Sequence, residues 1–383
     1  MKNWIRRALA THVVIALAAV YLVTSAPRAK ADAAGCIEAT SAAAGANHNL
    51  VVDAWFWIWT WGANEAGQLG DGTTTPRNVP TMLTTISDVA QVSAGTGHSL
   101  ALKRDGTVWA WGENSDGQLG TGTTTDSLTP VQVPGLSGVT AIAAGSNHSM
   151  ALKAAGIVVA WGDNSFGQLG DKTTNDSLSP TMVLSLDPSI RIAAGGRHSL
   201  ALKTDFTVRA WGSNDFGQLG DGTYVDSTSP VQVFGLSDIR EIGAGSRHSL
   251  ARRDLGSVWA WGDNSQGQLG TRGPDRSPVA MPTTFAGPVD DSVNWLYRID
   301  LNVIDRINGV AGGGSHSAGL STKGRVWTWG GNSSGQLGYG ATSASSMPTK
   351  LTGAWRAISL GEAHTLVIGT DVNRPGNPGG SKA

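Results

Sequence analysis

The sequence has little with which to build cross-links or strongly charged surfaces. Its single cysteine, Cys36, cannot form an internal disulfide, so stability must come from packing. Only 15% of the 383 residues are charged, whereas 52 are glycine, a composition that favours short strands joined by tight turns. The repeated part of the chain shows no apolar period of 3.6 residues, and we therefore expect no helical domain there.

The chain also lacks an excess of basic residues, since 28 Lys and Arg face 29 Asp and Glu. Residues 1–31 contain five of the basic residues and no acidic residue. Residues 32–383 therefore hold 23 basic against 29 acidic residues. Nucleic-acid binding needs a cluster of Lys and Arg that displaces counterions from the phosphates. We therefore expect no nucleic-acid partner.

The first 31 residues look like an export signal. A basic start and an apolar run over residues 8–23 precede Ala29-Lys30-Ala31, which fits a cleavage site. We predict that residues 1–31 are a signal peptide and that the mature protein is secreted or extracytoplasmic. Two alternatives keep the chain at a membrane: an uncleaved anchor, or lipidation at Cys36.

Two short motifs repeat along the chain and are locked to each other. In each of the first six repeats, the Trp of the second motif follows the His of the first after 13 residues. Such constancy means that both motifs belong to one structural unit. The Gly-x-x-His motif ends at His48, His98, His148, His198, His248, His316 and His364. The Trp-Gly motif, which continues to Gly-Gln-Leu-Gly, starts at Trp61, Trp111, Trp161, Trp211, Trp261 and Trp329.

Within one unit the apolar residues alternate with period two, as in strands. Residues 139–144, 149–152, 158–161 and 180–183 predict four strands, and Asp105-Gly106 in another unit marks a tight hairpin between the second and the third. Four strands in about 50 residues describe one propeller blade. A blade cannot bury its own faces, so the copies must pack on one another around an axis.

The paired signatures, as in AAGSNHSMALK followed by VVAWGDNSFGQLG, resemble the repeats of the regulator of chromosome condensation family. The resemblance implies a seven-bladed β-propeller, which we assign to residues 32–370, with a disordered Pro/Gly tail over 371–383. Seven His motifs but only six Trp motifs predict four-stranded blades with an irregular seventh. The alternative is six blades plus an extra hairpin. The family usually closes its ring with strands from both termini.

The repeated polar residues are interpreted as structural. Equivalent positions lie on different blades, so the seven His cannot converge on one metal ion, and we expect each imidazole to bond backbone across its blade. The repeated Asn and Gln are expected to satisfy their own loops. We find no nucleophile beside a His and an acid, no phosphate-binding loop and no calcium loop. The sequence therefore predicts no catalytic residues, no metal and no cofactor, and the protein is not expected to be an enzyme.

Positions where the repeats differ are the better candidates for function, because the blade does not require them. One face is predicted to hold two Arg and two Phe in equivalent slots of neighbouring blades, a surface that suits a protein partner. The opposite face holds an aromatic hairpin tip, which suits sugar rings or a protein. An insertion within residues 285–302 offers a third loop. The candidates are Arg197, Arg247, Phe166 and Phe216 on the first face, Trp55 and Trp57 on the second, and Trp295, Tyr297 and Arg298 in the insertion.

Three functions follow from these features. The first is an exported scaffold for protein–protein interaction, including an inhibitor of another exported protein. The second is a cell-wall or carbohydrate-binding module that uses Trp55 and Trp57. The third is a regulator of a small GTPase, because the resemblance implies nucleotide exchange and chromatin contact for the nuclear members and β-lactamase inhibition for some secreted bacterial propellers.

Overall fold

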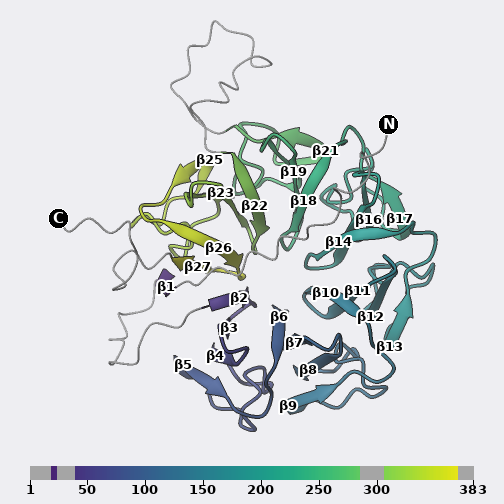
Figure 1. The fold of residues 1–383 in the computed structure, drawn as a ribbon. Helices are drawn as coiled ribbons and strands as arrows, with labels where there is room; N and C mark the ends of the chain where they lie inside the picture. Colours follow the sequence, from purple (N-terminus) through teal and green to yellow (C-terminus); the bar gives the residue numbers. More distant parts are fainter. Residues whose placement is uncertain (1–18, 24–38, 285–305, 370–383) are drawn as a thin grey trace, which may run out of the picture.

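The computed structural model describes residues 19–23, 39–284 and 306–369. All regular secondary structure in these ranges consists of β-strands. The sheets stand side by side in a ring, with the chain running round the ring from β2 to β27 (Figure 1). The all-β prediction is confirmed. Among the described residues, none forms a helix that is long and apolar enough to cross a membrane.

Six sheets are blades of four antiparallel strands, each paired with the next in sequence. Blade 1 holds β2 (Ala39–Ala44), β3 (His48–Asp53), β4 (Ile58–Gly62) and β5 (Arg77–Leu83), and blade 2 holds β6 (Val89–Ala94), β7 (His98–Lys103), β8 (Val108–Gly112) and β9 (Ser127–Gln132). Blade 3 holds β10 (Val139–Ala144), β11 (His148–Lys153), β12 (Val158–Gly162) and β13 (Ser177–Met182), and blade 4 holds β14 (Ser189–Ala194), β15 (His198–Lys203), β16 (Val208–Gly212) and β17 (Ser227–Gln232). Blade 5 holds β18 (Ile239–Ala244), β19 (His248–Arg253), β20 (Val258–Asp263) and β21 (Arg276–Pro282), and blade 6 holds β22 (Ile307–Gly312), β23 (His316–Ser321), β24 (Val326–Gly330) and β25 (Ser345–Lys350).

The remaining sheet, here called the closing sheet, has three strands. The hairpin of β26 (Trp355–Leu360) and β27 (Thr365–Gly369) pairs through β27 with β1 (Ala19–Val23), in the order β1-β27-β26. The prediction of a seven-bladed propeller with an irregular seventh blade is therefore wrong: six sheets are four-stranded blades, and the alternative of six blades plus an extra hairpin describes the chain. The reason is that no Trp-Gly strand follows His364, so the neighbour of β27 comes from the apolar run of the predicted signal peptide.

The core lies between neighbouring blades. Trp161 of blade 3 is fully buried against Leu100, Val108 and Leu119 of blade 2, and the other regular blades repeat this arrangement. Gly120 shows why the Gly-Gln-Leu-Gly motif ends in glycine, because its φ is 69° and a Cβ there would lie 2.8 Å from the indole nitrogen of Trp161. Each blade is therefore completed by the next.

The register of the strands sorts the connections into two faces. In blade 3, His148 pairs with Gly162 at one end and Leu152 pairs with Val158 at the other. The Gly-x-x-His turns and the Trp-Gly-x-Asn loops lie at the first end, which we call the His-tip face. The second-to-third strand hairpins and the connections to the next blade lie at the other end, which we call the hairpin face. This division is the one that the sequence predicts.

Candidate functional site

The repeated histidines form a hydrogen-bonded seam between blades. Nε2 of the buried His98 lies 3.0 Å from Oγ of Ser149 in the next blade. Ser149 donates to the carbonyl oxygen of Gln118 at 2.8 Å, and the Trp161 indole donates to the same oxygen at 2.9 Å. Because the serine hydroxyl uses its proton in this way, it accepts from a protonated Nε2, which fixes the histidine tautomer.

The seam continues round the whole ring, including the closing sheet. Its bonds join His48 to Ser99, His98 to Ser149, His148 to Ser199, His198 to Ser249, His248 to Ser317, His316 to Thr365 and His364 to Asn49. Burial lowers the pKa of His98 to about 3 and that of His148 to about 4, so both imidazoles are neutral near pH 7. The structural interpretation of the histidines agrees with this arrangement, but the expected backbone partner is wrong, because the partner is a side chain of the next blade.

The repeated Asn and Gln side chains satisfy their own loops, as expected. In the first repeat, Asn64 donates to the carbonyl oxygens of Thr73 and Thr75 and accepts from the amide of Leu69. Gln68 accepts from the amide of Ala66 at 3.0 Å. These residues hold the loops of the His-tip face in place and carry no ligand chemistry of their own.

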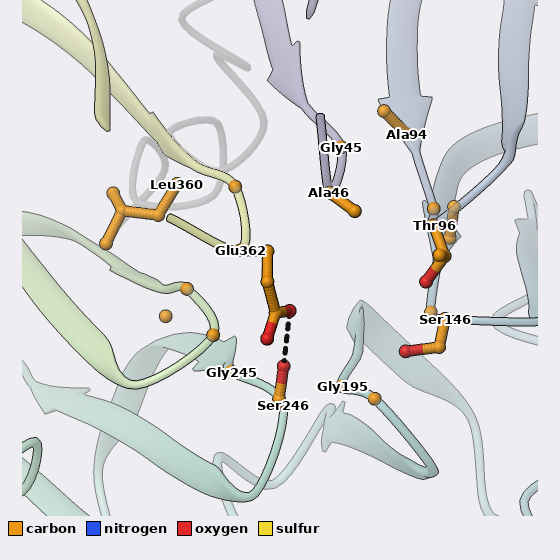
Figure 2. Close-up of a pocket in the computed structure, with 18 of the residues that line it drawn as sticks. Gly45, Ala46, Ala94, Thr96, Ser146, Gly195, Gly245, Ser246, Leu360 and Glu362 are labelled. Atoms are coloured by element: carbon orange, nitrogen blue, oxygen red, sulfur yellow. Dashed lines mark hydrogen bonds between the residues drawn. The ribbon is translucent and has the colours of Figure 1, made fainter. Parts of the chain in front are cut away.

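A small cavity lies on the axis of the ring, where the Gly-x-x-His turns converge (Figure 2). One charged side chain enters the cavity, that of Glu362 in the closing sheet. Its carboxylate accepts a hydrogen bond of 3.1 Å from the Ser246 hydroxyl of blade 5. Gly314 of blade 6 lies between these two turns, and a Cβ there would collide with the backbone carbonyl oxygen and the carboxylate of Glu362. The sequence signal was available, since the slot after the first Gly is uncharged in the six other turns.

The four candidates on the His-tip face form two stacked pairs between neighbouring blades. The Arg197 guanidinium lies 4.9 Å from the centre of the Phe166 ring, and Arg247 lies 4.8 Å from Phe216. In the preceding pair of blades the same two slots hold Asn147 and Asp116, joined by a hydrogen bond of 2.8 Å. The Phe residues thus hold the exposed Arg side chains in fixed positions on this face.

The aromatic tip on the hairpin face is open to solvent at Trp55, which is 67% exposed, while Trp57 is half-buried. Phe56 between them has a positive φ of 68°, and Arg104 of blade 2 lies 4.4 Å from its ring centre. Phe206 repeats this arrangement in blade 4, with a φ of 64° and Arg240 at 3.9 Å. Trp55 is therefore the freely accessible ring of this tip.

Several predicted features lie outside the described residues: Cys36, the tail and the insertion loop with Trp295, Tyr297 and Arg298. Their predicted roles stay predictions. Within residues 39–284 and 306–369, no group of three His, Cys, Asp or Glu side chains is placed to hold a metal ion.

Charge is divided unequally between the two faces, a feature that composition alone conceals. Assigned by strand register, the His-tip face of the described chain carries 14 acidic and six basic residues, whereas the hairpin face carries eight acidic and 14 basic residues. The formal charges are thus −8 and +6. The basic residues of the His-tip face are Arg77, Lys172, Arg197, Arg247, Arg272 and Arg276. The acidic residues of the hairpin face are Asp53, Asp88, Asp105, Asp187, Asp205, Asp238, Glu241 and Asp254.

Comparison with known proteins supports the resemblance seen in the repeats. Residues 22–297 match the family model of the RCC1-like domain, and residues 307–336 and 323–368 match models of the regulator of chromosome condensation (RCC1) repeat. No curated protein sequence matches significantly.

Solved structures of similar fold include human WBSCR16, with a TM-score of 0.76 and 24% identity over 90% of this chain and 94% of that one. Yeast RCC1 (Prp20) bound to Kap60 has a TM-score of 0.74 and 25% identity over 87% of this chain and 80% of that one. Prp20p from Saccharomyces cerevisiae, described with its binding to Gsp1p and histones, has a TM-score of 0.72 and 26% identity over 86% and 82% of the two chains.

Proposed function

Because this chain belongs to the RCC1-like domain family, we propose that it is a regulatory protein that acts by binding other proteins, in the manner of an exchange factor for a small GTPase. The observation that carries the proposal is the match to Prp20p, which extends over most of both chains. Prp20p binds Gsp1p and histones. The exported scaffold expected from the leader has less support, since it depends on residues 1–31 alone.

The His-tip face is the surface that we propose for a protein partner. Its charge of −8 is complementary to a basic protein surface, and complementary charge accelerates encounter and selects partners. Arg197 and Arg247 are held on Phe166 and Phe216, so little side-chain entropy is lost when they bind. Arginine anchors of this kind often dominate the energy of an interface.

Nucleotide exchange tests the proposal directly. The purified chain is added to Gsp1p and to other small GTPases loaded with a fluorescent guanine nucleotide, and the rate of release is measured. We expect at least one of them to release nucleotide about tenfold faster or more, and R197A/R247A to lose most of this acceleration. The matched control is R104A/R240A, which removes two equally stacked arginines from the hairpin face. No acceleration with any GTPase, from a folded protein, would remove the exchange-factor function.

A second candidate, an exported carbohydrate-binding or scaffold protein, is favoured by the leader-like residues 1–31 and by the exposure of Trp55. Fractionation of the producing cells decides between the two locations. A glycan array compared with a pull-down from envelope proteins then separates sugar from protein partners, with W55A as the variant that a sugar-binding site would not tolerate.

A further inference from the structure

The hairpin face combines a net positive charge with exposed apolar side chains. Its described residues carry a formal charge of +6, although the described chain as a whole carries two more acidic than basic residues. It also exposes large apolar side chains: Trp55 is 67%, Leu255 56% and Ile157 44% exposed in the hairpins, and Ile190 at the start of β14 is 43% exposed. We infer that this face docks on a membrane surface that contains anionic lipid.

The basic residues are spread over the whole face and are held there by the fold. Blade 5 contributes Arg240, Arg252 and Arg253, and the neighbouring blades add Lys153 and Arg306 among others. Part of the charge is balanced within the face, since Arg240 pairs with Asp254 at 3.2 Å and Lys203 with Asp187 at 2.7 Å. The excess of +6 counts every acid of the face that lies within residues 39–284 and 306–369. Each Lys or Arg near an anionic bilayer contributes about 1 kcal/mol of attraction, which is about fivefold in partitioning.

The apolar tips distinguish a lipid surface from other polyanions. Three successive blades each expose one aliphatic side chain: Ile157, Ile190 and Leu255. Aliphatic side chains do not stack on aromatic rings, so these residues have no stacking role. At a lipid surface such side chains enter the boundary between headgroups and acyl chains, where apolar burial adds to the attraction of the charges. Against a nucleic acid they would face phosphates and gain nothing. Trp55 adds an indole, the side chain that is most at home in the interfacial region.

The two faces therefore have different tasks. A protein that lies with the hairpin face on a membrane presents the acidic His-tip face to the solution, where the proposed partner would bind. The inference does not rest on the proposed function, since a scaffold with another partner would dock in the same way.

Vesicle sedimentation tests the inference with the full chain. Vesicles of phosphatidylcholine and phosphatidylserine are compared with vesicles of phosphatidylcholine alone, at low and at physiological salt. Binding to the neutral vesicles reports apolar attraction that needs no anionic lipid, so the proposed docking is measured as the additional binding that phosphatidylserine produces. We expect that addition to be at least tenfold and to weaken with salt.

Matched variants locate the binding surface. K153E/R306E on the hairpin face should reduce the phosphatidylserine-dependent partitioning by about tenfold or more, and L255S should reduce it severalfold. The controls K172E/R272E and V225S make the same kinds of change on the His-tip face, where Val225 is 70% exposed, and should leave it unchanged. Thermal unfolding checks that each variant is folded.

Three results would overturn the inference. One is equal binding to both kinds of vesicle. Another is equal loss in the two sets of variants, which would indicate net charge instead of a docking face. The third is capture by soluble nucleic acid or polyglutamate but not by anionic vesicles, which would assign the face to a different polyanion.

Discussion

The six four-stranded blades and the closing sheet share one hydrogen-bonded seam, but the side chains that pack around this seam differ. At a regular seam, such as His98 to Ser149, the hydroxyl, the Trp161 indole and the Gln118 carbonyl oxygen form one buried network. The closing sheet has no Trp-Gly strand of its own, and the cluster that it forms with blade 6 contains Leu320, Val326 and Val367 but no fully buried Trp. On its other side the closing sheet packs Leu366 and Ile368 against the buried Trp61 of blade 1. The ring is thus continuous in hydrogen bonding, but the packing between blade 6 and the closing sheet lacks a buried Trp, which makes this junction its weakest part.

Acid gives the largest expected effect, and it acts on the buried histidines of the seam. Burial lowers the pKa of His48, His98, His198 and His316 to about 3, whereas an unfolded histidine titrates near 6.5. Between these values the unfolded chain binds more protons than the folded chain, so the free energy of unfolding falls as pH falls through this window. Each such histidine costs about 1.4 kcal/mol per pH unit at full effect.

We therefore expect the melting temperature to be steady above pH 7 and to fall steeply between pH 6.5 and 4. Chemical unfolding measured at several pH values gives the slope. H148N should reduce the slope more than H364N, because His148 is fully buried and His364 is half-buried. A stability that stays constant from pH 7 to pH 5 would contradict the buried, neutral histidines.

Removal of residues 1–31 tests the closing sheet. This segment contains β1, whose five residues pair with β27 from Ala19–Gly369 to Val23–Thr365. Without β1 the outer edge of β27 is open, and the loss of a few strand hydrogen bonds of about 1 kcal/mol each is expected to cost about 2–3 kcal/mol. Hydrogen exchange should accelerate in β27 and stay unchanged in β11, its regular counterpart. Unchanged protection in β27 would show that β1 contributes nothing to the ring.

The loss of a single seam hydrogen bond should cost more free energy of unfolding in a regular blade than in the closing sheet. S149A removes the acceptor of the buried His98 and is expected to cost about 2 kcal/mol, because a buried donor is left unsatisfied. N49A removes the acceptor of His364, but this half-buried imidazole can reach water, and we expect about 1 kcal/mol. The two free energies of unfolding, measured in denaturant under the same conditions, should keep this order. An equal or reversed order would mean that the closing seam is as well buried as the regular ones.

The repeats made the regular blades predictable and left the exceptions open. The fixed distance from His to Trp gave the strand order, both faces and the structural role of the histidines, because each unit faces a copy of itself. The number of blades was wrong because no Trp-Gly strand follows His364, and β1, which pairs with β27 instead, comes from a segment that the sequence assigns to export. The partner of His98 was also missed, since Ser149 immediately follows the next histidine and shows its role only when two blades stand side by side.

The smallest expected effect comes from Phe206, which replaces the glycine found at Gly106 and Gly156. Its φ of 64° is costly for a residue with a Cβ, by about 1 kcal/mol, while the stacked Arg240 returns a similar amount. F206G relieves the strain and loses the stacking, so we expect a change in unfolding free energy of less than about 1 kcal/mol. F206A loses the stacking but keeps the strain, and it should be less stable than F206G by about 1 kcal/mol. If the two variants unfold at the same denaturant concentration, the positive φ of residue 206 has no cost for a residue with a Cβ, and Phe206 is not a strained residue.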